Sequence, residues 1–207
     1  MTTLQMSCTA PPGELCVSTL ESERLMLRPP QLADAPAIAA LANNRKVAEM
    51  TASIPHPYRV GDAEAWITRL ADKAGPVFGI FARKGGAFVG ACDYQMRDEA
   101  IPEIGYWIGE PFWGRGFATE AVRTMIDHAF TATDLEALAA SCRVTNLASR
   151  HVLEKCGFQW TGVGLLRVRT LGASVPSDRF RLDRRTWVAL RAWGKTRLPV
   201  RKRAARG

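Results

Sequence analysis

The chain has 207 residues, of which 47% are hydrophobic and 23% are charged, and this is ordinary for a single globular domain with a substantial core. No apolar run approaches the roughly 18 residues of a membrane-spanning helix, and Met1 to Pro12 lack the basic and apolar segments that a secretory signal needs. Five scattered cysteines without a C-x-x-C pair argue against a disulfide framework or a Cys/His metal cluster, and they favour reduced thiols in a cytoplasm.

The formal net charge of +8 is concentrated near the C-terminus. From Arg191 onward the chain holds seven Lys and Arg residues and no acidic residue, so residues 1–190 carry 8 − 7 = +1. Basic tails contact RNA, DNA or anionic membranes in some proteins, but they are more often solvated chain ends. We therefore expect a loosely ordered segment at 1–20, one domain at 21–192, and a basic tail at 193–207 that contacts nucleic acid weakly at most.

Apolar spacing and turn residues predict an alternation of strands and helices. Strands are expected over 24–28, 77–83, 87–96, 101–108, 137–144, 158–170 and 180–182. Helices are expected after the capping residues Asp34 and Asp62, over 116–131 and 146–156, and around 187–193. A loop with two prolines runs from Met50 to Tyr58, and a Gly/Pro loop separates the last two strands. Strands and helices that alternate around a glycine turn indicate an α/β sheet.

The stretch from Ile104 to Glu120 organises the rest of the chain. It starts as an apolar strand, breaks at Glu110-Pro111, and passes through the Gly114-Arg115-Gly116 turn into an amphipathic helix. Free N–H groups and the positive dipole end at a helix N-terminus favour a phosphate there, and the two glycines let it approach the backbone. P-loop and dinucleotide fingerprints do not fit, because no Lys follows Gly116 and Thr119 stands where a third glycine is needed.

Three segments resemble one enzyme family. Trp113 to Ala121 is similar to the acetyl-CoA pyrophosphate loop of the GNAT N-acetyltransferases, and in particular to the branch of the ribosomal-protein N-terminal acetyltransferases. Asn146 to Phe158 is similar to that branch's N-x-x-S-x-x-V-L-x-K-x-G-F helix, and Glu23 to Pro29 looks like its first strand. The resemblance covers about residues 21–190.

The resemblance implies the GNAT fold, of the α/β (α+β) class. A central mixed, mostly antiparallel sheet of about seven strands is expected, flanked by helices. The sheet is expected to splay between the strands at 104–108 and 137–144, with acetyl-CoA as co-substrate in the gap and no metal. The resemblance leaves a monomer and a homodimer open.

The resemblance also implies which residues hold acetyl-CoA. The main chain of Tyr106, Trp107 and Ile108 is expected to bind the pantetheine arm as an added strand would, and to offer an N–H to the thioester oxygen, while the side chains pack. Asn146 and Ser149 are expected to contact acetyl-CoA as well. The alternative is that Asn146 only caps its helix and Ser149 packs against it. The pyrophosphate is expected on the glycine turn and the first helical turn: Gly114, Arg115, Gly116, Phe117, Ala118 and Thr119.

Acetyl transfer to an amine needs a proton donor for the leaving thiolate and a way to deprotonate the amine. Many members of the family carry a donor Tyr where this chain has Leu153, so Ser149, one helical turn earlier, becomes the candidate donor, with small-residue packing as the alternative. Glu103 at the mouth of the central strand is the candidate base, with a solvated surface charge as the alternative. Glu120 suits the first turn of a helix and is expected to be structural.

The predicted function is acetyl transfer from acetyl-CoA to a primary amine, and the expected acceptor is a protein or peptide N-terminus. The walls of the acceptor site are expected at 54–58, which includes His56, and at 172–178. A small-molecule amine or an antibiotic remains an alternative acceptor. Two other classes stay open: an acyl-CoA sensor without catalysis, because Leu153 replaces the usual Tyr, and an RNA- or ribosome-associated module that works through its basic tail.

Overall fold

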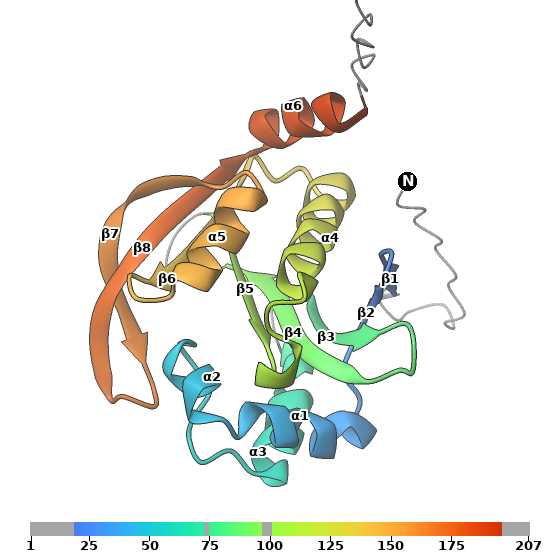
Figure 1. Ribbon diagram of the computed structural model, residues 1–207, viewed down its shortest axis with the longest axis vertical. Coiled ribbons are helices and arrows are strands. Elements are labelled where there is room, and N and C mark those ends of the chain that lie inside the picture. The colour runs from blue at the N-terminus through green and yellow to red at the C-terminus, as the bar shows by residue number, and fades with distance from the viewer. Residues whose placement is uncertain (1–18, 73–74, 97–100, 196–207) are drawn as a thin grey trace, which may run out of the picture.

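The computed structural model describes residues 19–72, 75–96 and 101–195. Its strands form one eight-stranded sheet in the order β1-β2-β3-β4-β5-β6-β8-β7 (Figure 1). Every neighbouring pair is antiparallel except β5 and β6, which are parallel. The strands are β1 (Leu20–Glu21), β2 (Leu25–Arg28), β3 (Val77–Ala82), β4 (Phe88–Gln95), β5 (Glu103–Ile108), β6 (Ala137–Arg143), β7 (Gln159–Val168) and β8 (Ala173–Asp183).

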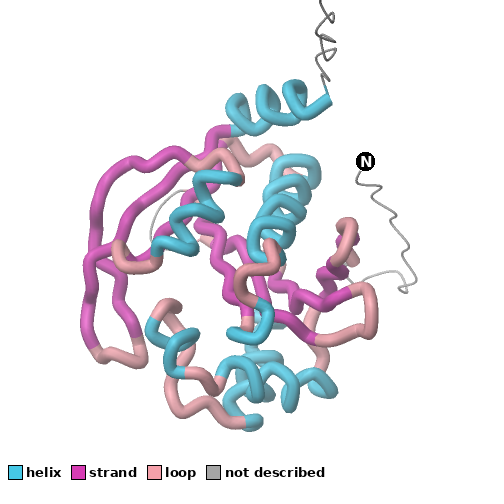
Figure 2. Tube along the Cα trace, viewed as in Figure 1, coloured by secondary structure: helices cyan, strands magenta, loops and turns pink. Residues whose placement is uncertain are grey.

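Helices cover both faces of this sheet (Figure 2). On one face lie α4 (Phe117–Ala132) and α5 (Leu147–Lys155), and on the other lie α1 (Ala35–Ala42), α2 (Arg45–Glu49) and α3 (Val60–Thr68). The last helix, α6 (Arg184–Lys195), follows β8 directly. Three short 3-10 turns complete the described elements: η1 (Leu32–Asp34), η2 (Arg69–Asp72) and η3 (Glu110–Phe112).

Each layer of helices has its own apolar core. Buried residues of α4, such as Met125 and Ile126, pack with Ile104 and Ile108 of β5. The core on the other face gathers buried residues of α1 and α2, and Trp107 of β5 packs against it. Successive side chains of a strand point to opposite faces. Tyr106 therefore faces α4 and α5, while Glu103 shares the face of Trp107, toward α1–α3.

The sheet opens between β5 and β6. The register of this pair contains one residue couple, Glu103 opposite Ala139, and the Ala139 N–H donates to the Pro102 carbonyl oxygen at 2.9 Å. Beyond that point β5 stays paired with β4, and β6 stays paired with β8. The splayed sheet and the α+β fold class predicted from the sequence are therefore confirmed.

The number of strands is eight, whereas about seven were predicted. The additional strand is β1, which pairs Leu20 with Leu27 and lies at the edge of the segment that was expected to be loosely ordered. Residues 1–18 and 196–207, which hold most of the two expected terminal segments, lie outside the described residues. No helix in the described part of the chain is long and apolar enough to cross a membrane.

Two elements differ from the sequence-based expectation. The Gly/Pro segment before residue 180 was predicted as a loop, but only Gly172 lies in a turn, and the residues from Ala173 onward belong to the long strand β8. Pro176 is tolerated there because its backbone faces the side on which the pairing with β6 has already ended at Ser177, so little is lost from one missing donor. Helix α2 was not predicted, although Asn44 caps it by accepting the N–H groups of Lys46 and Val47.

Candidate functional site

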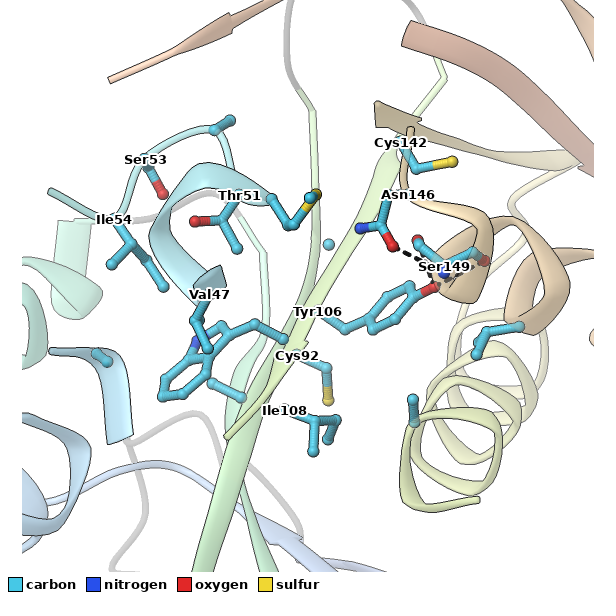
Figure 3. A pocket seen from close by; sticks show the side chains of 18 of the residues that line it. Val47, Thr51, Ser53, Ile54, Cys92, Tyr106, Ile108, Cys142, Asn146 and Ser149 are labelled. Atoms are coloured by element: carbon cyan, nitrogen blue, oxygen red, sulfur yellow. Dashed lines mark hydrogen bonds between the residues drawn. The ribbon is translucent and has the colours of Figure 1, made fainter. Parts of the chain in front are cut away.

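A cavity of about 1090 Å³ lies where β5 and β6 separate (Figure 3). Its lining comes from both faces of the sheet: the turn before α4, β5 and the start of α5 on one side, and α2 with the loop after it on the other. In Figure 3, Tyr106, Asn146 and Ser149 lie on one side of β5, and Val47, Thr51, Ser53 and Ile54 lie on the other. A molecule bound here would therefore contact residues on both sides of β5.

The turn that enters α4 is shaped to receive an anion. Gly114 and Gly116 have φ angles of +71° and +77°, which is the left-handed region that glycine adopts without strain. A Cβ at Gly114 would meet nothing within 4 Å, so the space in front of the turn is open. The first N–H groups of the 16-residue helix α4 have no intrahelical acceptor, and they face this space with the positive end of the helix dipole. Such a turn is the kind of site at which phosphate groups bind.

Glu120 in the first turn of α4 holds the glycine turn against the turn between β1 and β2. Its carboxylate accepts hydrogen bonds from Ser22 Oγ, Arg24 N and Arg24 Nε, each at 2.7 Å. Arg24 Nη1 in turn donates to the Arg115 carbonyl oxygen at 2.9 Å. Burial acts to raise the pKa of Glu120, but the hydrogen bonds from Arg24 and Ser22 hold it below its ordinary value. The carboxylate therefore fixes the position of the glycine turn through Ser22 and Arg24, which is a structural role.

The edge of β5 that faces the gap has backbone groups that no strand covers beyond Glu103, in the part of the chain that the structure describes. One of them is already satisfied, because Trp113 Nε1 donates to the Ile108 carbonyl oxygen at 2.6 Å. The residues expected to hold the pantetheine arm, Tyr106, Trp107 and Ile108, all line the cavity. An extended amide-containing chain is the kind of ligand that an exposed strand edge binds.

Three side chains meet at the start of α5. The Asn146 side chain caps the helix, with Oδ1 accepting the Ser149 N–H at 3.1 Å. The Tyr106 hydroxyl reaches across from β5, and its oxygen lies 2.8 Å from Ser149 Oγ (Figure 3). Burial raises the pKa of the Tyr106 hydroxyl well above its ordinary value, and it raises the pKa of the nearby Cys142 thiol to about 11. Both groups therefore carry their protons at neutral pH.

Acidic side chains lie on the opposite face of β5. Glu103 accepts a hydrogen bond from the Ser141 hydroxyl, and Asp93 of β4 stands opposite Gly105, two residue pairs along the sheet from Glu103. Both carboxylates line the cavity. Asp93 also accepts a hydrogen bond from Gln95 Nε2 at 2.8 Å. At close range these two carboxylates would stabilise a cationic group such as an ammonium, and the basic side chains of Lys46, Arg69 and Arg169 line the same cavity.

The outer wall of this acidic side is built from two segments that are distant in sequence. Met50 to Pro55 line the cavity, and the turn after β7 holds them by two hydrogen bonds. The Arg169 N–H donates to the Ala52 carbonyl at 2.9 Å, and Thr170 Oγ1 donates to the Ile54 carbonyl at 2.7 Å. We call this pair of contacts the clasp. The clasp joins the loop after α2 to the turn of the β7–β8 hairpin.

The structure brings most of the sequence-predicted site residues into this cavity. Glu103 and Ser149 line it from opposite faces of β5, together with Asn146, the three strand residues and most of the glycine turn. Among the described residues, Arg115 does not line it; its guanidinium lies 5.0 Å from the centroid of the Phe117 ring. His56 is likewise outside the lining, whereas the exposed His151 of α5 lines it.

The expected second wall at 172–178 is wrong in its position. No residue of that segment lines the cavity, and Leu166 and Arg169 of the preceding strand and turn take its place. Sequence analysis also missed Asp93 and the Tyr106 hydroxyl. The alternation of β4 was the available indication for Asp93, because Ala91 and Asp93 share one face of that strand.

Within the described residues, no group of three or more His, Cys, Asp or Glu side chains is arranged to hold a metal ion. The described cysteines Cys92, Cys142 and Cys156 are buried free thiols.

Comparison with known proteins gives one consistent result. Residues 24–159 match the family described as the acetyltransferase (GNAT) domain. The chain is 31% identical over 153 residues to the uncharacterized N-acetyltransferase p20 of Bacillus licheniformis, covering 71% of this chain and 85% of p20. It is 36% identical over 56 residues to the ribosomal-protein-serine acetyltransferase of Escherichia coli (strain K12), covering 27% of this chain and 31% of that protein. The solved structure of Mycobacterium smegmatis RimJ in complex with CoA-disulfide aligns with a TM-score of 0.69 and 25% identity, covering 83% of this chain and 90% of that one.

Proposed function

The chain belongs to the acetyltransferase (GNAT) family of N-acetyltransferases, and on this basis we propose that it moves the acetyl group of acetyl-CoA onto the α-amino group of a protein or peptide N-terminus. One observation carries the proposal. A single cavity joins an anion-binding glycine turn and a hydroxyl donor on one face of β5 to two carboxylates on the other face. Direct transfer needs both substrates held in line, with no covalent intermediate.

Holding the co-substrate falls to backbone groups. The N–H groups of the Gly114–Thr119 turn would bind its diphosphate, and the exposed edge of β5 would bind its pantetheine arm. Bound there, acetyl-CoA supplies an activated acyl group as a thioester. An N–H of β5 would donate to the thioester oxygen as negative charge develops on it, and this hydrogen bond would stabilise the transition state.

Proton transfer is divided between the two faces of β5. On the face toward α5, Ser149 would donate a proton to the sulfur as the carbon–sulfur bond breaks. On the face toward α1–α3, Glu103 would take a proton from the incoming amine, directly or through a water. General acid–base catalysis of this kind contributes about 10²–10⁴-fold to a rate. Asp93, two residue pairs away along the sheet, would attract the ammonium form to the same end of the cavity.

An α-amine suits this site better than a lysine side chain. The reference pKa of an α-amine is about 7.7–8.0 and that of Lys is about 10.4, so roughly a tenth of α-amines are neutral at pH 7, against about four in ten thousand lysines. A site with Glu103 as its candidate base and Leu153 in the place of a Tyr donor is matched to the more easily deprotonated nucleophile. The clasped wall also favours a slender chain end over a wide surface.

We expect the protein to acetylate a peptide with a free N-terminus and blocked lysines much faster than the same peptide with an acetylated N-terminus and free lysines. The reference pKa values allow a ratio of several hundred at pH 7, roughly in proportion to the neutral fractions. The measurement is CoA release at matched peptide concentration, with mass spectrometry to locate the acetyl group. Preference for the lysine peptide overturns the assignment. Turnover of only polyamines or aminoglycosides would give the function to small-molecule amines.

Replacing Glu103 by Gln should move the ascending limb of the pH–rate profile to higher pH. Without the carboxylate the amine must lose its proton unaided, so activity at pH 7 should fall by about tenfold to 100-fold. Activity should recover as the pH approaches the pKa of a free α-amine. The matched control is Glu64→Gln, which removes an exposed carboxylate of α3 that does not line the cavity. If both variants keep the wild-type profile, Glu103 is not the base.

A further inference from the structure

Tyr106 and Ser149 are joined by a contact that the sequence did not reveal. The Tyr106 hydroxyl oxygen lies 2.8 Å from Ser149 Oγ and 3.2 Å from the Ser149 carbonyl oxygen. Both residues line the cavity, and the contact spans the gap between β5 and α5 (Figure 3). The tyrosine is therefore next to the group that would release a proton during acetyl transfer.

The two contacts can be satisfied in two ways, because a phenol has a single proton and a carbonyl oxygen can only accept. In the first arrangement Tyr106 donates to the Ser149 carbonyl, and the Ser149 hydroxyl proton points back to the tyrosine oxygen. In the second, Tyr106 donates to Ser149 Oγ, and the serine proton is left to point into the cavity. A negative sulfur in the cavity favours the second arrangement, and hydroxyl rotation is enough to reach it.

We propose that Tyr106 is a positioning residue for the Ser149 acid: its hydroxyl donates a hydrogen bond to Ser149 Oγ while Ser149 passes its own proton to the departing sulfur. The proposal rests on the proposed function, in which Ser149 is the proton donor. As the carbon–sulfur bond breaks, its electron pair stays on sulfur and the Ser149 proton forms the S–H bond. The nitrogen loses one proton to Glu103 and a second as the amide forms; this second proton returns to Ser149 through water, and Tyr106 keeps its proton throughout.

The properties of Tyr106 agree with this role. Its ring packs against the buried core, a task that Phe would perform equally well. A buried hydroxyl without a partner costs free energy, and in the structure the hydroxyl contacts Ser149 through both its Oγ and its carbonyl oxygen. Burial raises the pKa of this hydroxyl, so it remains a donor over the whole range in which an amine can react. A developing charge on Ser149 Oγ strengthens the hydrogen bond from Tyr106.

The test is a double-mutant cycle with Tyr106→Phe, Ser149→Ala and the double variant, measured by single-turnover acetylation of the free-N-terminus peptide and by the acetyl-CoA dissociation constant. Tyr106→Phe should slow transfer by about tenfold, the expected size for one hydrogen bond to a charged group, with little change in acetyl-CoA affinity. The double variant should be no slower than Ser149→Ala, because Tyr106 acts only through Ser149. The control is Tyr94→Phe, which removes a buried hydroxyl from the same core on the neighbouring strand, outside the cavity lining.

Each result decides the matter. Full activity of Tyr106→Phe, or a double variant that loses the product of the two single effects, overturns the proposal while leaving the proposed function intact. Full activity of Ser149→Ala overturns the assignment of the acid, and the role of Tyr106 is lost with it. A wild-type protein that acetylates none of the amines overturns the proposed function itself. If Tyr94→Phe slows acetyl transfer as much as Tyr106→Phe does, both losses come from disturbed core packing and the proposal is wrong.

Discussion

Replacing Gly116 by Val should abolish the stabilisation of this protein by acetyl-CoA. A ligand that binds only the folded state at 100 times its dissociation constant adds about 2.7 kcal/mol to the free energy of unfolding. For a domain of this size, that corresponds to a rise in Tm of roughly 5–11 °C. The wild-type protein should show this shift, and the variant should show none, because the valine side chain would occupy the approach of the diphosphate to the turn. The measurement is thermal unfolding with and without saturating acetyl-CoA.

The control must separate lost binding from backbone strain, because Gly116 has a φ of +77° that a valine adopts poorly. Gly85 in the turn between β3 and β4 has a similar φ of +86°, and no atom within 4 Å would meet its Cβ. Gly85→Val should therefore lower the Tm in the absence of ligand but keep the full shift with acetyl-CoA. An undiminished shift in Gly116→Val would mean that the co-substrate is held elsewhere.

Ser149→Ala should lower kcat by about 100-fold or more, at the lower end of what general acid catalysis contributes. The loss is expected in kcat because a proton donor acts in the transition state and not in the complex with acetyl-CoA. The shift in Tm with acetyl-CoA should remain, since Asn146 still caps α5 and the glycine turn is untouched. The measurement combines steady-state kinetics with the same unfolding assay.

Two outcomes would contradict this assignment of Ser149. Unchanged kcat would leave the hydroxyl as a packing group that the Tyr106 hydroxyl happens to contact. A variant that loses its shift in Tm together with its activity would show that Ser149 helps to hold acetyl-CoA, as Asn146 was also expected to do. In the second case the proton of the thiol must come from water or another side chain.

The parts of the site that follow the local sequence were predictable. The passage from an apolar strand through Gly114 and Gly116 into a helix is encoded within a few residues, and the structure has it as predicted. The same holds for the helix start at Asn146, where a side chain bonds a nearby backbone N–H. These features depend on backbone geometry and on hydrogen bonds between residues a few positions apart, which sequence patterns record directly.

The parts that depend on distant contacts were not predictable. Tyr106 and Ser149 are 43 positions apart, and no local sequence pattern predicts the contact between their hydroxyl groups. The acceptor wall was placed at 172–178 because Gly and Pro there resemble a loop, but pairing with β6 and β7 extends β8 through that segment. The clasp, which sets the actual wall, joins positions more than a hundred residues apart and follows only from the tertiary structure.

The opening between β5 and β6 also bears on how the protein avoids aggregation. An exposed strand edge is a template on which another chain can add a strand, and proteins usually protect such edges at the rim of a sheet. Here the uncovered edge lies in the interior of the sheet, between β5 and a strand that is already paired with β8. Helix α4 packs on β5 on one face and Trp107 joins the α1–α3 core on the other. A full polypeptide strand from a neighbouring molecule would have to displace these layers, so the open backbone edge of β5 is protected from strand addition by other chains.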